Sequence, residues 1–120
     1  MAGNYAIDIN DGVTVIRFSD EPSLNDIRNA IDVTAANKSM NELRLWDLTN
    51  IGLDFNNDEI HELAEYSKSK FLLPSRVAIV APNDLVFGLS RIYEAYREEG
   101  LVKHRVFRTE KEARVWLLQK

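Results

Sequence analysis

The sequence predicts one α/β domain with a mainly parallel sheet, an antiparallel hairpin strand at the N-terminal end, and helices on both faces. Two observations lead to this prediction. Apolar patterns with a strand period alternate with patterns of a helical period, and only Asp11-Gly12 separates the first two strand patterns. Strands that alternate with helices are joined by right-handed crossovers and form parallel sheets. The expected order is β-β-α-β-α-β-α-β-α in a single domain spanning residues 1–120.

The first two strands are expected at 5–9, where polar and apolar side chains alternate, and at 13–18. Asp11 and Gly12 between them form a strong hairpin signal, because glycine adopts positive φ freely and aspartate tolerates it. Three further apolar runs predict strands at 43–48, 76–81 and 103–108. The run at 76–81 is apolar throughout after its first residue, which is typical of a strand covered on both faces.

The first two predicted helices begin at capping signals. Ser23 followed by Asp26 forms a capping box, and Asn56 or Asn57 precedes the acidic first turn of the second helix. The third helix follows the turn at 82–84, is expected to end at Gly100, and has its inward face assigned to Leu85, Leu89, Ile92 and Tyr96. A last helix is expected at 110–118.

Composition and charge exclude several functions. The chain has no cysteine, so disulfides, thiolate metal sites and cysteine nucleophiles are absent, in accord with an expected cytoplasmic location. The net charge of −4 argues against general nucleic-acid binding. Residues 91–120 nevertheless carry eight basic and five acidic side chains, so a local anion patch and helix-surface ion pairs are both open. No apolar run is long enough for an integral membrane protein.

Three stretches resemble a known family: Arg76–Tyr96, Arg105–Leu117 and the tetrapeptide Trp46-Asp47-Leu48-Thr49. Together they resemble the bacterial SpoIIAA-like group of STAS-type domains. The resemblance implies a small fold of the anti-sigma-factor-antagonist kind and little about activity, and it implies lipids or other small apolar molecules as one ligand class. It also implies a phosphorylatable Ser or Thr at the start of the second helix. Asn56 and Asn57 occupy that place here, so we predict no phosphorylation there.

Polar side chains gather in the loops that follow the parallel strands, and these loops meet at the carboxyl edge of the sheet, where ligands of open α/β sheets usually bind. The candidate ligand-binding residues of these loops are Thr49, Asn50, Asn56, Asn57, Asn83 and Arg108, with Ser19 and Thr109 nearby. The alternative is that the asparagines only cap helices and form turns. Arg108 is the one cation of the set.

No constellation predicts an enzyme, a metal or a cofactor. His61 and Glu65 lie one letter from a zinc signature, but two ligands on one helix are too few. Asp20, Glu21 and Asp47 resemble the acidic part of a phosphoacceptor site, but Arg108-Thr109 stands where its lysine is needed. We therefore expect no catalytic residue, no metal ligand and no cofactor.

The favoured function is a non-enzymatic binding or regulatory module that docks an unidentified protein or small molecule at the carboxyl edge. The alternative is a carrier of a small apolar or lipid-like ligand, held in a cavity under the third helix and lined by Leu89, Ile92, Tyr93 and Tyr96. An uncharacterised hydrolase using Asp47 and Asp84 is a distant third hypothesis.

A homodimer contact or ligand lip is expected at Phe87, which lies about 100° around the third helix from Gly88 and points partly away from the sheet. The substitution Phe87→Glu should then reduce self-association or ligand retention, measured by analytical ultracentrifugation, and leave the melting temperature nearly unchanged. A loss of more than about 3 kcal/mol of stability would instead assign Phe87 to the core.

Overall fold

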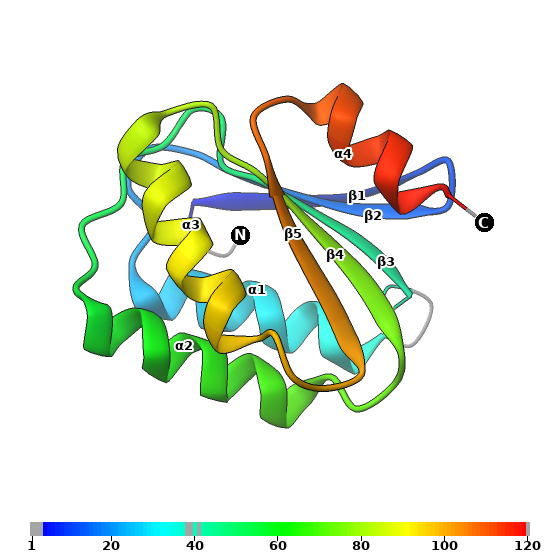
Figure 1. Cartoon of the computed structure of the whole chain (residues 1–120), viewed down its shortest axis with the longest axis horizontal. Coiled ribbons are helices and arrows are strands. Elements are labelled where there is room, and N and C mark those ends of the chain that lie inside the picture. Colours follow the sequence, from blue (N-terminus) through cyan, green and yellow to red (C-terminus); the bar gives the residue numbers. More distant parts are fainter. Residues whose placement is uncertain (1–3, 38–39, 41, 120) are drawn as a thin grey trace.

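A computed structural model describes residues 4–37, 40 and 42–119. It contains one five-stranded sheet in which the strands lie side by side in chain order (Figure 1). The strands are β1 (Tyr5–Asn10), β2 (Val13–Phe18), β3 (Leu43–Asp47), β4 (Ser75–Val80) and β5 (Val102–Phe107). β1 pairs antiparallel with β2, and every other pair is parallel. The predicted sheet, with its antiparallel hairpin strand at the edge, is confirmed.

The helices cover the two faces of the sheet unequally (Figure 1). They are α1 (Leu24–Ala36), α2 (Asn57–Lys70), α3 (Asp84–Tyr96) and α4 (Glu110–Leu117). Each of the first three connects neighbouring parallel strands, and because such crossovers share one hand, all three lie on the same face. α4 covers the opposite face. Among the described residues, no helix has the length and apolar character needed to cross a membrane.

Local sequence signals explain the turns and helix starts. Asp11 and Gly12 have φ of 53° and 78°, as a two-residue hairpin turn requires. Ser23 and Asn56 each form a complete capping box, with Asp26 and Glu59 respectively. α3 ends at Tyr96, before the expected Gly100, and Arg97 is its C-cap, with an N–H that donates to the carbonyls of Tyr93 and Glu94.

Two apolar cores lie on the two faces. The larger core packs α1, α2 and α3 on the sheet, and its most buried members include Ile16, Ile31, Val77 and Val86. The smaller core packs α4 on the other face through Ala113 and Leu117, against the residues Val13, Val15, Leu45, Ala78 and Val80.

The inward face of α3 differs from the predicted one. Leu85 is 64% exposed and Ile92 is 37% exposed, whereas Val86, Ser90 and the C-cap residue Arg97 are buried. The assignment from the sequence was wrong here because it followed the most apolar stripe. The helix is instead turned so that two polar side chains face the sheet.

Polar groups line the amino half of the same face. Arg44 and Arg97 are 1% and 3% exposed, and His104 lies beside them on β5. Burial, together with the nearby positive charges of Arg97 and Arg44, lowers the pKa of His104 from 6.5 to about 3. The folded protein therefore holds this imidazole neutral.

We predict that His104 makes the fold acid-sensitive. Between pH 6.5 and about 3 the unfolded chain binds a proton at His104 that the folded chain does not, so stability falls as the pH falls. Between pH 7 and pH 5 this single residue should remove about 2 kcal/mol from the free energy of unfolding, measured in urea. The variant His104→Gln should lose that part of the slope. An unchanged slope in the variant would contradict the assignment.

Candidate functional site

Three of the polar side chains predicted at the carboxyl edge cap helices. Asn56 Oδ1 accepts the Glu59 N–H at 2.9 Å and caps α2. Asn83 Oδ1 accepts the N–H groups of Leu85 and Val86 at 2.9 and 3.2 Å and caps α3. Thr109 caps α4 in the same way. These side chains have structural partners, as the alternative interpretation of the loop set requires.

Arg108 and Phe87 lie together at this edge. The Arg108 Nη1 donates to Asp84 Oδ1 at 2.6 Å and to the Pro82 carbonyl at 3.0 Å. Its guanidinium carbon lies 3.9 Å from the centroid of the Phe87 ring, as in a cation–π contact. Phe87 is half-buried and also packs against the larger core. Part of its ring is therefore covered within the chain, and self-association through Phe87 stays a prediction.

The remaining loop candidates differ in their contacts. Thr49 binds Asp47 through both its N–H and its hydroxyl. Asn50 and Asn57 are exposed, Asn50 in the turn after β3 and Asn57 as the first residue of α2. Asp20, in the loop after β2, has a φ of 57° and pairs with Ile51, which joins two of the loops at this edge.

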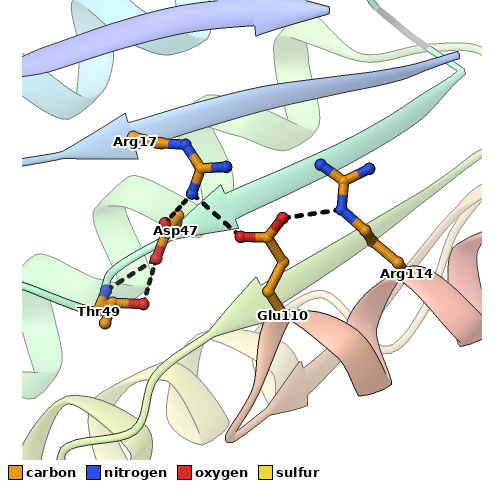
Figure 2. A network of polar contacts seen from close by, with 5 residues as sticks. All are labelled: Arg17, Asp47, Thr49, Glu110 and Arg114. Carbon is orange, nitrogen blue, oxygen red and sulfur yellow. Dashed lines mark hydrogen bonds and ion pairs between the residues drawn. The ribbon is translucent and has the colours of Figure 1, made fainter. Parts of the chain in front are cut away.

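Figure 2 shows a polar network, here called the Asp47 network, that links β2 and β3 to α4 and consists of Arg17, Asp47, Thr49, Glu110 and Arg114. The Arg17 guanidinium lies between two carboxylates: it forms an ion pair with Asp47 and another, at 3.1 Å, with Glu110. Arg114 then holds Glu110 at 2.8 Å. Asp47 is 8% exposed and accepts three hydrogen bonds, which hold its carboxyl group in place.

The charges within the Asp47 network reinforce one another. Hydrogen bonds from Arg17 and Arg114 lower the pKa of Glu110 below its ordinary value. The hydrogen bond to Glu110 raises the pKa of Arg17. These shifts stabilise the charged forms, the opposite of what a proton-transfer catalyst near neutral pH requires. The network therefore holds α4 on the sheet.

An apolar pocket, here called the α3 pocket, lies on the other face, between the sheet and the three helices. Its volume is about 70 Å³. The lining residues are Phe18, Ile27, Ile31, Trp46, Leu48, Leu53, Phe55, Ile60, Leu63, Ile79, Leu89, Ser90 and Tyr93. Phe18 ends β2, Leu48 follows β3, and Leu53 and Phe55 belong to the loop before α2. The pocket therefore belongs to the carboxyl half of the sheet.

The α3 pocket matches the predicted cavity only in part. Leu89 and Tyr93 line it as expected, but Ile92 and Tyr96 do not. Tyr96 instead packs on His61, with ring centroids 4.5 Å apart. The sequence analysis missed Ser90, whose buried hydroxyl has no hydrogen-bond partner in the described structure. A helical periodicity through Val86, Ser90 and Tyr93 is the signal that could have found it.

No group of three or more His, Asp or Glu side chains that could hold a metal ion occurs within the described residues. His61 lies exposed on α2, and its ring packs on an aromatic side chain. Arg91 and Arg114 of the basic end form ion pairs with Glu94 and Glu110 on their own helices.

Comparison with solved structures gives matches along nearly the whole chain. A DUF3478-family protein from Shewanella loihica, described as having a SpoIIAA-like fold, matches with a TM-score of 0.63 and 18% identity over 96% of this chain and 94% of that one. The chain has a SpoIIAA-like fold. An anti-sigma factor antagonist from Mycobacterium paratuberculosis matches equally well, with a TM-score of 0.63 and 16% identity over 96% and 93% of the two chains.

The SpoIIAA-like fold also relates the chain to SpoIIAA itself. The unphosphorylated anti-sigma factor antagonist SpoIIAA matches with a TM-score of 0.51 and 12% identity, over 93% of this chain and 96% of that one. No family model and no curated protein matches the sequence. The resemblance seen in the sequence is therefore confirmed at the level of the fold.

We predict that Asp47 stabilises the fold more than Glu110 does. Asp47→Ala removes a buried carboxyl group that accepts three hydrogen bonds. This substitution should lower the free energy of unfolding by about 2 kcal/mol. Glu110→Ala removes a more exposed partner and should cost less than about 1 kcal/mol. Asp47→Asn, which keeps an acceptor for Thr49, should fall between them in urea unfolding. A larger loss for Glu110→Ala would contradict this order.

Proposed function

We propose that this protein is a non-enzymatic binding module whose ligand inserts an apolar group into the α3 pocket. The observation that supports this most directly is the pocket's composition: all but one of its thirteen lining residues are apolar or aromatic. Ligand sites are concave and mostly apolar, with a few polar groups that fix orientation. Ser90 and the rim at the carboxyl edge supply such groups.

The α3 pocket is too small to enclose a whole ligand and instead fits a single apolar group of a larger ligand. A dry cavity of about 150 Å³ accommodates benzene, and this pocket has about half that volume. It fits a branched aliphatic group, such as a leucine-sized side chain or one end of a small molecule. The alternative function is that of a carrier for a lipid-like ligand, and this function requires the pocket to enlarge.

The state of the acidic side chains supports a module without catalysis. Asp47 and Asp84, the two residues of the hydrolase hypothesis, pair with Arg17 and Arg108 respectively. Both carboxyl groups therefore already have a cationic partner, and within the described residues neither lies beside a second acid or base that would suit proton transfer.

Structural neighbours of this fold include anti-sigma factor antagonists, which makes a protein a reasonable source of the apolar group. We propose that partner binding here is not controlled by phosphorylation at the start of α2. Asn56 and Asn57 stand there, and Asn56 already accepts the Glu59 N–H as the helix cap. Neither side chain can accept a phosphoryl group.

The test closes the α3 pocket and leaves the helix intact. Leu89→Trp places a bulky ring at the pocket, whereas Ile92→Trp places the same ring on the exposed side of α3. Isobutanol, titrated into isotope-labelled protein, should shift the methyl resonances of Ile27, Ile60 and Leu63. The shifts should be lost in Leu89→Trp and kept in Ile92→Trp.

A second arm of the test distinguishes a protein ligand from a small molecule. Peptides selected from a displayed random library should share an apolar anchor and lose binding in Leu89→Trp if the source is a protein. If no peptide is enriched but isobutanol binds, the ligand is a small molecule. Failure of both probes to bind the pocket in the wild type would overturn the proposal.

A further inference from the structure

A second group of side chains lies deeper on the same face, towards the amino ends of the strands. It consists of Arg44, Arg97 and His104 and is here called the buried basic cluster. In the sheet, Arg44 pairs with Val77 and Val77 with His104, so these residues form one row across β3, β4 and β5. Arg97 reaches the row from the C-terminal end of α3.

Aromatic and hydroxyl groups surround the buried basic cluster. The Arg44 guanidinium carbon lies 3.8 Å from the centroid of the Phe71 ring. The Tyr93 ring packs edge-on against His104 at 5.5 Å, and the Tyr93 hydroxyl lies 2.6 Å from Ser67 Oγ. These neighbours shield the cations from water but carry no negative charge.

The buried basic cluster brings positive charges close together under the helices. Burial, together with the nearby charge of Arg97, lowers the pKa of Arg44 from 12.5 to about 10. The same two arginines lower the pKa of His104 and that of the Tyr93 hydroxyl, although burial raises the latter overall. Arg97 forms no ion pair within the described residues.

Arg97 also has hydrogen-bonding capacity to spare. It is 3% exposed, and its Nε and one terminal nitrogen have no hydrogen-bond partner. Buried guanidinium donors are normally satisfied, because an unpaired buried charge costs several kcal/mol. The Nδ1 of His104 is a further buried atom without a partner. Unused donors on a buried cation thus point at a missing acceptor.

We propose that the buried basic cluster is a binding site for a small oxyanion, a carboxylate or a phosphate group, held by the guanidinium groups of Arg97 and Arg44. A guanidinium presents two parallel N–H donors that match the oxygens of either group. The neighbouring hydroxyls are already engaged, because Ser67 Oγ donates to the Ala64 carbonyl and lies 2.6 Å from the Tyr93 hydroxyl, so the arginines are the donors of the site. Because the site is buried, its ligand is a small ion or the terminal group of a slender molecule.

The site is separate from the α3 pocket, although Tyr93 borders both. The pocket occupies the row of Trp46 and Ile79, and the buried basic cluster occupies the preceding row of Arg44 and Val77. Loss of isobutanol binding in Leu89→Trp therefore tests the pocket alone, and the anion site can fail or succeed independently.

The experiment titrates the full chain with sodium phosphate and with sodium acetate, using sodium chloride at equal ionic strength as the reference. At least one oxyanion should raise the melting temperature saturably beyond the effect of chloride, and the more effective one identifies the ligand class. Arg97→Met should weaken the apparent affinity by at least about tenfold, since a charge-assisted hydrogen bond is lost. Arg97→Lys should restore part of it.

The control is Arg91→Gln, which removes one positive charge from the exposed side of the same helix and should leave the affinity unchanged. If Arg97→Met does not fold, the Nε–Hε resonances of the wild-type arginines provide the test, and those of Arg97 and Arg44 should move first. Equal responses to oxyanions and chloride, with unmoved Arg97 resonances, would overturn the proposal and assign the arginines to the fold alone.

Discussion

The handedness of the crossover connections determines how this molecule distributes its chemistry. The strands lie in chain order, and each of the three parallel pairs is joined through one helix. Connections of one hand that all advance in the same direction must leave their helices on the same face. α1, α2 and α3 therefore crowd one side of the sheet, and only the eight residues of α4 cover the other.

The crowded face is divided along the strand direction. Its carboxyl half is apolar and contains the α3 pocket, whereas its amino half contains Arg44, Arg97 and His104. Tyr93 lies at the division: its ring borders both regions and its hydroxyl bonds Ser67. The opposite face is simpler, with an apolar patch under α4 and the Asp47 network at its rim.

Much of this fold was predictable because its signals are local. The Asp11-Gly12 turn, the capping boxes at Ser23 and Asn56 and the order of elements depend only on residues near one another in the chain. The candidate site was less predictable. The sequence predicted that the loop asparagines lie at the carboxyl edge. Whether each of them caps a helix or is free to bind a ligand depends on the residue at which the helix begins.

The inward face of α3 could not be predicted from its own sequence. Leu85 and Ile92 are the more apolar choice, yet Ser90 and Arg97 are buried together with Val86. The helix packs over a row of the sheet that contains Arg44, about fifty residues away in the chain from Arg97. Pairings at such a separation, like that between Arg17 and Glu110, are set by the assembled sheet.

The shortness of α4 has a consequence for how the chain matures. A helix of eight residues is too short to persist by itself in water. It forms only when Ala113 and Leu117 dock on Val13, Val15 and Leu45, which belong to the first half of the chain. During synthesis on the ribosome, the face of the early strands that α4 covers therefore stays exposed until α4 has been synthesised. That interval is when chaperones and neighbouring chains can reach an apolar sheet surface that the finished protein hides.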